Sequence, residues 1–422
     1  MLESAEGPRK LSQYSFIGFS PTRVVKVKNQ KYTEFSPDSN SSSVDTDEPF
    51  ARLRAILSEN RTTYRGFRFV GGLVGYFSYD AVRYLESLPS HATDDLNFPD
   101  LEFGVYDDGI VFDHLTGQAY YYWHTTNRIR LIEQQLRQRI RTRELVAGGL
   151  GTDISQSYFE NMVNRAKKYI KEGDIFQTVL SKRFHCSFRG DLIDFYKLLK
   201  EINPSPYMYF LKMKTRAIVG SSPEMLGRVD GRNVETFPIA GTRPIGKNLN
   251  EDKRLANDLL KDPKERAEHV MLIDLARNDV GKFCEFGTVK VPEFMTVQKY
   301  SHVQHIVSRV SGKLRPDQDA LNAFTGIFPA GTVSGAPKKR AMEIIDELEP
   351  HRRGPYAGAV GYFSYNGNAD FAITIRTLMA EGNRAYIQAG AGIVADSQPQ
   401  REWVETENKA TALLRALRIR GT

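Results

Sequence analysis

Two pairs of glutamates are the residues with the clearest potential for chemistry in this 422-residue chain. In each pair the residues are three apart on an expected helix: Glu265 and Glu268 on residues 263–282, Glu402 and Glu405 on residues 402–418. Carboxylates at this spacing repel each other unless a cation lies near them. The pairs therefore indicate either a site for Mg²⁺, which prefers hard oxygen ligands, or two solvated acidic helix faces. Zinc is disfavoured, because neither helix has the histidine spacing that zinc sites use.

Three glycine-rich turns could bind an anion. They cover residues 239–246, 329–337 and 389–394. Glycines let backbone N–H groups converge on an anion, and Thr242 and Thr332 add hydroxyl donors. None of the turns matches a P-loop or a dinucleotide fingerprint, so nucleotide binding is disfavoured. Each turn alone is more often a tight connection, but the three together indicate a site for a carboxylate-bearing ligand.

One arginine and two histidines fall on strands expected near these turns. Residues 371–377 alternate in polarity, which places Arg376 on the polar face of a strand. Its guanidinium could clamp a carboxylate with two parallel hydrogen bonds or form a structural ion pair. His302 and His305 fall on opposite faces of a strand expected over residues 297–310, so at most one can point into a given site. Either could instead be a hydrogen-bonded core residue.

Periodicity predicts the elements that carry and surround these residues. Helical spacing appears over residues 50–57 and 157–171, and within the arginine-rich segment 128–143. Residues 104–123 have the pattern of two strands around a turn, and the polar residues 36–46 that of an exposed loop.

A repeated nonapeptide and a glycine-rich segment indicate the overall organisation. GLVGYFSYD at residues 72–80 and GAVGYFSYN at residues 358–366 match at seven of nine positions, which predicts two equivalent positions in a sheet. The mixture of strand and helix patterns predicts an α+β fold with large antiparallel sheets packed between outer helices. Residues 143–153 are the expected boundary between an N-terminal section, 1–145, and a second section, 153–420.

Composition limits the classes of protein to consider. The length allows a substantial core, and two cysteines without a spacing motif are typical of a reducing compartment, so we expect a cytoplasmic protein. No apolar run is long enough to span a membrane. The net charge of +7 arises from scattered basic residues, which favours attraction of a small anion. A basic, non-catalytic module that binds RNA or protein is the competing class, but a contiguous basic surface with aromatic platforms is not indicated.

Long ordered motifs give the chain a resemblance to a known family. They are NPSPYM from residue 203, SSPE from 221, PIAGTRP from 238, RAEHVMLIDLARND from 266, SHVQH from 301, AGTVSGAPK from 330, RGPYAGAVGY from 353 and GAGIV from 390. In these motifs, over nearly its whole length, the chain resembles the chorismate-utilising enzymes, and within them the branch of anthranilate synthase large components. The resemblance implies a two-domain α+β fold with an interwoven N-terminal portion and a magnesium-dependent reaction of chorismate, a dicarboxylate.

The resemblance also implies roles for the candidate residues. Glu265, Glu268, Glu402 and Glu405 match the acidic shell that holds Mg²⁺ near the ring carboxylate of chorismate. The positions matching those that bind the enolpyruvyl carboxylate are Tyr356, Arg376, Gly390 and Gly392. Glu224 matches the general acid that protonates the departing C4 hydroxyl, for which burial would raise its pKa. The remaining matches line the ring or complete the site: His305, a candidate for proton transfer, Thr332, Gly241 and Thr242.

Two positions distinguish this chain from relatives with other products. Ala240 replaces the nucleophilic lysine of aminodeoxychorismate synthases, and Gln177 replaces the water-activating lysine of isochorismate and salicylate synthases. A neutral amide cannot deprotonate water but can accommodate ammonia. Both departures favour addition of ammonia at C2 and loss of pyruvate, giving anthranilate, the first step of tryptophan synthesis. Aminodeoxychorismate and isochorismate or salicylate synthesis remain the alternative activities.

The resemblance implies partners as well. The chain has no candidate Cys-His-Glu constellation, so ammonia would come from solution or from a separate glutamine amidotransferase subunit, in a heterotetramer of two large and two small subunits. Nucleic acid and membranes are not expected partners.

Tryptophan is the expected inhibitor. The matching positions of its site are Leu2, Glu3 and Ser4, then Pro206, Tyr207 and Met208, then Val360, Gly361 and Tyr362. Glu3 could hold the tryptophan ammonium, while Met208 and the aromatic residues enclose the indole. Because the sequence starts one residue before Leu2, we expect either further residues upstream or a weak site on a frayed terminus.

Overall fold

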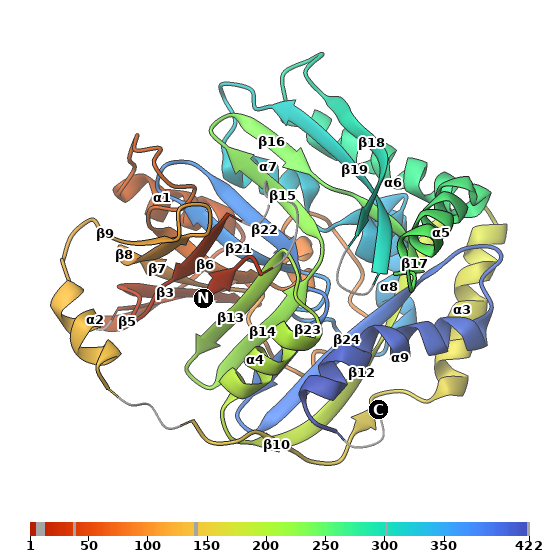
Figure 1. The fold of residues 1–422 in the computed structure, drawn as a ribbon, viewed down its shortest axis with the longest axis horizontal. Helices are drawn as coiled ribbons and strands as arrows, with labels where there is room; N and C mark the ends of the chain where they lie inside the picture. Colours follow the sequence, from red (N-terminus) through yellow and green to blue (C-terminus); the bar gives the residue numbers. More distant parts are fainter. Residues whose placement is uncertain (6–12, 37–38, 139–141, 300–302, 420–422) are drawn as a thin grey trace.

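A computed structural model describes residues 1–5, 13–36, 39–138, 142–299 and 303–419, and two large antiparallel sheets dominate it (Figure 1). The first sheet contains, in spatial order, β10 (Val146–Ala147), β12 (Gln177–Arg189), β24 (Arg384–Ile393), β23 (Thr377–Glu381), β14 (Arg216–Ser222), β13 (Tyr207–Met213), β1 (Leu2–Glu3), β2 (Tyr14–Ile17), β8 (Asp108–Asp113) and β9 (Gln118–Trp123), with β11 (Gly151–Thr152) and β20 (Gly335–Ala336) also paired to β12.

The second sheet lies against the first. Its strands, in spatial order, are β17 (Ile239–Pro244), β19 (Val303–Lys313), β16 (Asn233–Thr236), β15 (Met225–Asp230), β22 (Ala369–Ile373), β21 (Ala359–Ser364), β6 (Gly72–Phe77), β7 (Leu101–Tyr106), β3 (Arg23–Lys28), β4 (Lys31–Ser36) and β5 (Ser39–Asp45), with β18 (Lys290–Lys299) paired to β19. The α+β fold with large antiparallel sheets is therefore confirmed.

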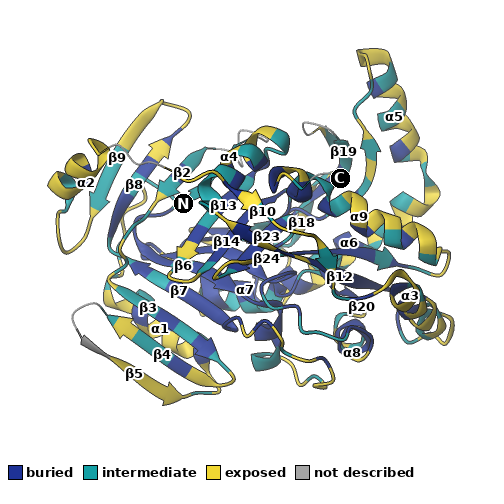
Figure 2. Cartoon of the chain, turned by 90° about the horizontal axis from the view of Figure 1, so that it is seen from below, coloured by how far each residue is buried: buried dark blue, intermediate teal, exposed yellow. Residues whose placement is uncertain are grey.

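Helices lie outside the sheets, and buried residues concentrate between the layers (Figure 2). The helices are α1 (Pro49–Glu59), α2 (Ile129–Leu136), α3 (Gln156–Lys171), α4 (Leu192–Ile202), α5 (Leu249–Lys261), α6 (Pro263–Gly281), α7 (Ala320–Ile327), α8 (Lys338–Leu348) and α9 (Pro399–Ala416), with short 3-10 turns η1 (Tyr79–Tyr84) and η2 (Gly331–Val333). Phe50 of α1 and Phe324 of α7 stack on Phe77 of the second sheet, whereas α4 and α9 cover the first. Burial of these apolar faces, rather than helix propensity, holds the layers together.

The repeated nonapeptides mark the centre of an internal symmetry. Strands β6 and β21 pair with each other, with Gly75 opposite Gly361. A Cβ on either glycine would lie 2.0 Å from a carbonyl oxygen of the next strand, which explains why both positions are glycine. The order β6, β7, β3, β4 on one side is mirrored by β21, β22, β15, β16 on the other. The prediction of two equivalent sheet positions is thus confirmed.

The first sheet repeats this symmetry about β1 and β13. There β1, β2, β8, β9 are mirrored by β13, β14, β23, β24. The molecule therefore has an N-terminal half, β1 to β9, and a C-terminal half, β13 to β24, with matching strand order. In each half the chain crosses directly between sheets twice: at residues 18–22 and Asp107 in the first half, and at Pro223–Glu224 and residues 374–376 in the second.

These crossings correct two predictions about strands. Residues 104–123 contain parts of three strands, because Asp107 separates β7 in the second sheet from β8 in the first. Residues 371–377 are not one strand: β22 ends at Ile373, β23 starts in the other sheet, and Arg376 has a φ of 51° in the bend between them. Arg376 therefore does not belong to a strand face.

One loop prediction and one further strand prediction were wrong, and the helix predictions were confirmed with shifted ends. Residues 39–45, expected in a loop, form the exposed edge strand β5, because an edge without a buried face needs no apolar alternation. The predicted strand over residues 297–310 is not one strand: residues 297–299 end β18 and residues 303–310 belong to its antiparallel partner β19. His302 lies outside the described residues.

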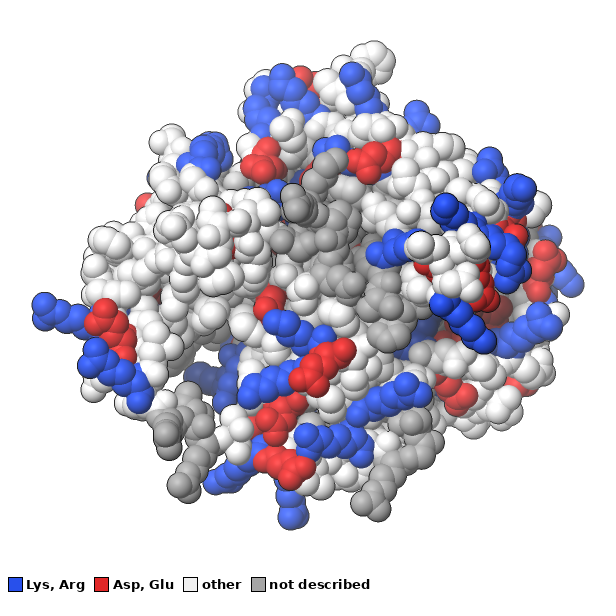
Figure 3. Space-filling model, in the orientation of Figure 1, with Lys and Arg blue, Asp and Glu red and all other residues white. Residues whose placement is uncertain are grey.

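The distribution of charged side chains on the surface matches the scattered basic and acidic residues of the sequence. On the face shown in Figure 3, basic and acidic side chains are interspersed among the described residues. Within the same part of the chain, no helix combines the length and the apolar character needed to cross a membrane.

Candidate functional site

The first pair of glutamates lies at the start of α6. Asp262 caps this helix by accepting hydrogen bonds from the backbone N–H groups of Lys264 and Glu265, at 3.0 and 3.3 Å. The cap places Glu265 beside β17, where Arg243 forms ion pairs with Glu265 at 3.4 Å and with Asp262 at 2.9 Å. Sequence patterns did not identify Arg243 as a neighbour of this pair, although it lies in the PIAGTRP motif.

Glu268 faces the second pair across the gap between α6 and α9. Burial and then the charge of Glu265 raise the pKa of Glu268, and the charge of Glu405 adds to the rise. Burial also raises the pKa of Glu402. Glu405 forms an ion pair with Lys409, one turn further along α9, at 2.7 Å. Glutamates from two separate helices are therefore close enough to repel one another.

This carboxylate set is chemically suited to Mg²⁺. Its donors are hard oxygens, and a cation would relieve the repulsion that raises the pKa of Glu268. In the described residues, however, no three Asp, Glu, His or Cys side chains converge as a metal site. Glu265 and Glu405 are instead paired with Arg243 and Lys409. Lys409 was also not predicted, although it lies four residues after Glu405, the spacing of a helical ion pair.

The two crossings of the C-terminal half each carry a charged candidate residue. Burial raises the pKa of Glu224 to about 8, and the Thr332 hydroxyl and the Ile239 backbone N–H oppose only part of this rise. Glu224 thus carries a proton near neutral pH. The Arg376 guanidinium has neither an ion pair nor a side-chain hydrogen bond to any described residue, and burial lowers its pKa. It therefore retains donors for an anion.

His305 and the turn at Gly241 form one edge of the site. His305 Nδ1 lies 2.8 Å from the Gly241 carbonyl oxygen and 3.1 Å from Thr242 Oγ1. Burial lowers the pKa of His305, while the hydrogen bond to the Gly241 carbonyl opposes part of this shift and favours the tautomer that carries its proton on Nδ1. Gly241 has a φ of 66°, and a Cβ there would lie 3.0 Å from the Glu265 carboxylate, so glycine keeps the turn close to α6.

Two glycines of β24 form the opposite edge. A Cβ on Gly392 would lie 2.7 Å from Gln177 Nε2, and one on Gly390 would lie 2.7 Å from the Tyr356 hydroxyl. These side chains therefore lie directly against the strand. Gln177 Nε2 also donates to Glu268 at 3.2 Å, while its buried Oε1 has no hydrogen-bond partner. The glycines thus leave space that Gln177 and Tyr356 fill.

The inhibitor residues gather at a separate place, between β1, β13 and β21. A small cavity of about 40 Å³ there is lined by eight of the nine expected residues: Leu2, Glu3, Ser4, Tyr207, Met208, Val360, Gly361 and Tyr362. Pro206 is not part of the lining. Glu3 is already bonded to Lys200, at 2.6 Å, and to the Tyr196 hydroxyl. The cavity has room for only about three water molecules, so it must widen to admit an indole ring.

Comparisons with known proteins agree on one family. The profile of the chorismate binding enzymes matches residues 33–415. Anthranilate synthase component 1 of Methanothermobacter thermautotrophicus is 51% identical over 421 residues, covering all of this chain and 89% of that protein. The corresponding protein of Saccharolobus solfataricus is 43% identical, covering all of this chain and 94% of its own length. The crystal structure of anthranilate synthase component I from Streptococcus pneumoniae superposes with a TM-score of 0.88 at 37% identity, covering 97% of this chain and 93% of that one.

Proposed function

The chain belongs to the chorismate-binding enzymes, and we propose that it converts chorismate and ammonia into anthranilate and pyruvate. The observation that carries this choice of product is the side chain at the start of β12. Gln177 is buried against Glu268 and Gly392, where a lysine would be needed to activate water. The buried Ala240 supports the same choice, since it cannot form a covalent intermediate.

Each site residue has a task in this reaction. Arg376, Tyr356 and the backbone N–H groups of Gly390 and Gly392 bind the enolpyruvyl carboxylate. The protonated Glu224, with Thr332 beside it, gives its proton to the C4 hydroxyl, which leaves as water while ammonia adds at C2.

His305 acts in the second stage. Its neutral imidazole, oriented by Gly241 and Thr242, takes the C2 proton as the enolpyruvyl C–O bond breaks and pyruvate leaves. Mg²⁺, held by Glu268 and Glu405 with Glu265 and Glu402 beside them, would supply positive charge for the ring carboxylate.

The ammonia comes from a glutamine amidotransferase subunit, in an assembly of two large and two small chains in the cytoplasm. The names of the relatives, each a component of a larger enzyme, support a second subunit. Residues 153–420 carry the catalytic residues, and residues 1–145 contribute β1 to the tryptophan cavity.

A fluorescence assay tests the proposal, because anthranilate is fluorescent. The isolated chain with chorismate, Mg²⁺ and ammonium at alkaline pH should form anthranilate, whereas glutamine should support the reaction only after the amidotransferase subunit is added. Isochorismate or 4-amino-4-deoxychorismate as the main product would assign the chain to a different activity of the family. No consumption of chorismate would favour a non-catalytic role.

A further inference from the structure

Arg353, in the segment that follows α8, joins parts of the molecule that are distant in sequence. Its side chain is 1% exposed, and every nitrogen of its guanidinium donates a hydrogen bond. Nε and Nη2 bind the two carboxylate oxygens of Glu349 at 2.8 and 2.7 Å. Nη1 donates to the Val333 carbonyl at 2.7 Å and Nη2 to the Val179 carbonyl at 2.6 Å. A planar guanidinium can satisfy these acceptors together, which a lysine cannot do.

The two carbonyl groups belong to segments that carry site residues. Val333 directly follows Thr332 in η2, and Val179 lies two residues after Gln177 on β12. The guanidinium carbon also lies 5.7 Å from the centre of the Tyr356 ring, on the same segment as Arg353. Beside the backbone pairing of β12 with β20, this side chain therefore gives a second connection between the segment that carries Thr332 and the strand that carries Gln177.

Glu349 extends this connection along β12. Its Oε1 accepts hydrogen bonds from both the backbone N–H and the hydroxyl of Ser181, each at 2.8 Å. Gln388 of β24 donates to the same hydroxyl at 2.9 Å. A buried ion pair is a poor way to gain stability, because desolvation offsets most of the attraction. We therefore attribute to the Arg353–Glu349 pair a role in positioning β12, β24 and η2 relative to one another, rather than a role in stability.

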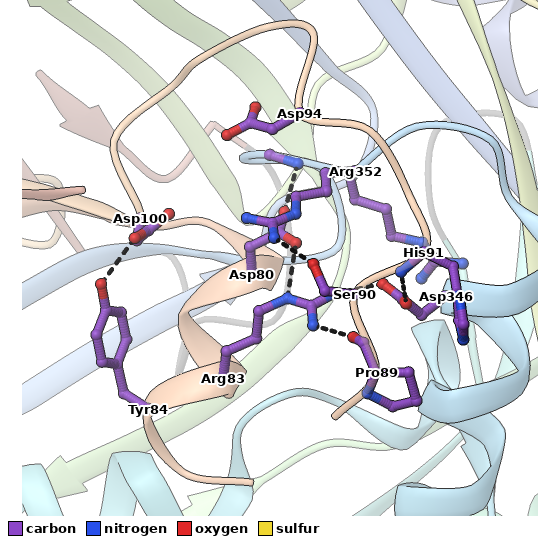
Figure 4. Close-up of polar contacts among 12 residues, drawn as sticks. Asp80, Arg83, Tyr84, Pro89, Ser90, His91, Asp94, Asp100, Asp346 and Arg352 are labelled. Atoms are coloured by element: carbon purple, nitrogen blue, oxygen red, sulfur yellow. Dashed lines mark hydrogen bonds and ion pairs between the residues drawn. The ribbon is translucent and has the colours of Figure 1, made fainter. Parts of the chain in front are cut away.

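The neighbouring Arg352 offers a contrast within the same segment. Its Nη2 donates to Ser90 at 2.9 Å, in a polar cluster with Arg83, His91 and Asp346 (Figure 4). This cluster attaches the end of α8 to the N-terminal half, and none of the residues labelled in Figure 4 was assigned to the site. Arg352 is half-buried and Arg353 is fully buried, so these adjacent arginines differ in burial as well as in their connections.

We propose that Arg353 is a positioning residue that holds Thr332 and Gln177 at their working separation. This inference rests on the proposed function, since it concerns the same site. Backbone pairing between β12 and β20, the strand that follows η2, remains without the guanidinium. Loss of the guanidinium would remove the side-chain contacts that hold the Val333 and Val179 carbonyls at a fixed separation, which displaces the groups around the leaving hydroxyl and the incoming ammonia. A displacement of about 1 Å at such a position can cost about a hundredfold in rate.

The test compares substitutions of the two arginines in the ammonia-dependent assay. Arg353→Lys keeps the charge, and the double substitution of Arg353→Gln with Glu349→Gln leaves no unpaired buried charge. We expect the double variant to lower kcat at least about tenfold and to raise the KM for ammonium. For Arg353→Lys, we expect values of kcat and KM between those of the wild type and those of the double variant. Arg352→Gln is the adjacent control and should change kcat less than about twofold, because its guanidinium bonds to Ser90 and not to a segment that carries site residues.

The outcomes separate this inference from the proposed function. A wild-type chain that makes no anthranilate would overturn the proposed function itself. An active wild type whose Arg353 variants keep kcat and the ammonium KM would overturn the positioning role. The same conclusion would follow if Arg352→Gln lowered kcat as much as the double variant, because the loss would then reflect general destabilisation. If the double variant does not fold, the kcat and ammonium KM of Arg353→Lys are compared with those of Arg352→Gln. Equal values in these two variants would overturn the positioning role.

Discussion

The two halves of the molecule share a strand order but use their crossings between sheets differently. In the N-terminal half, the Asp107 carboxylate is fully engaged: it accepts from the Tyr365 hydroxyl at 2.6 Å and from Thr22 at 3.3 Å. The C-terminal half places Arg376 at the equivalent crossing without a side-chain partner among the described residues, and Glu224 at the other with a raised pKa. Satisfied polar groups stabilise a crossing, whereas unsatisfied ones are available to a substrate.

A second difference concerns the space beside the crossings. A cavity of about 650 Å³ adjoins residues 18–21 of the N-terminal half and is lined mainly by apolar side chains, Phe19 and Tyr106 among them, with residues 210–214 of the C-terminal half on another side. The C-terminal half presents glycine-rich strands, carboxylates and a histidine at its crossings. The same strand order thus carries mainly apolar side chains beside the crossings of one half and the candidate catalytic residues beside those of the other. Substitutions at matched positions can test whether the two halves differ in their effects on stability and on activity.

The largest expected effect is the loss of turnover when the metal is removed. Chelation by EDTA should abolish turnover, and Glu268→Gln or Glu405→Gln should lower kcat about a thousandfold, because a Lewis acid loses a ligand. The matched substitution is Asp113→Asn, in a strand of the N-terminal half, whose buried carboxylate only accepts from a nearby backbone N–H. The Asp113→Asn substitution should leave kcat within about twofold of the wild-type value. Full activity in EDTA would contradict the assignment of the four glutamates.

Glu224 should produce the next largest effect. Its pKa is raised to about 8, so the acid form that donates the proton predominates below this pH and is lost above it. At a constant concentration of free ammonia, kcat should therefore fall as pH rises through about 8. Glu224→Gln should lower kcat by about 10² to 10⁴-fold and should remove this alkaline limb. An unchanged limb in the variant would show that another group titrates.

Arg376 and Asp107 provide the direct comparison of the two crossings. Arg376→Gln should lower kcat/KM for chorismate about a hundredfold, equivalent to about 2.8 kcal/mol, through the loss of charge-assisted hydrogen bonds to a carboxylate. Its stability should change little, because the guanidinium has no side-chain partner in the described protein. Asp107→Ala should do the opposite: kcat/KM unchanged, and the free energy of unfolding lowered by about 1 to 3 kcal/mol. Urea denaturation measures the free energy of unfolding of each variant, and steady-state kinetics measure its kcat/KM. Equal losses of kcat/KM in Arg376→Gln and Asp107→Ala would contradict the proposed difference between the two crossings.

The helices and the two strands of the repeated nonapeptide were predictable because their signals are local. Residues 263–281 follow a capping aspartate, and the apolar spacing of residues 157–171 is regular. The crossings were not predictable, because alternation continues through Asp107 and through residues 374–376 while the chain changes sheet. A change of sheet is a tertiary event that leaves no break in a local pattern.

The candidate residues of the site were chosen from motifs and stay a prediction, whereas their ion pairs could not be predicted from the sequence. Spacing alone places Glu265 and Glu268 on one face, yet only the fold shows that Arg243 of β17 reaches Glu265. The role suggested for Glu3 has the same limitation, because Lys200 and Tyr196 come from a helix nearly two hundred residues away. Long-range partners depend on how elements pack, which single-sequence patterns do not encode.

The smallest effect is expected at the boundary between the halves, where the tryptophan cavity lies. Tryptophan must widen this cavity and compete with Lys200 for the Glu3 carboxylate, so inhibition should be modest in the wild type. If bound tryptophan favours a state with lower chorismate affinity, chorismate must weaken tryptophan binding by the same factor. Substitutions that fill or reshape the cavity should therefore act on inhibition without altering catalysis.

Tryptophan titrations at low chorismate test this expectation in four proteins. Ser4→Arg and Met208→Thr should abolish inhibition, since the first introduces a bulky cation into the cavity and the second removes an apolar contact for the indole. Lys200→Met should instead strengthen inhibition a few-fold, because it frees Glu3 for the ammonium group at the cost of one exposed ion pair of about 0.5 kcal/mol. With no tryptophan present, all variants should retain the wild-type kcat. Equal sensitivity of the wild type and the three variants would exclude this cavity as the inhibitor site, whereas opposite shifts at Met208 and Lys200 would identify Glu3 as the ammonium ligand.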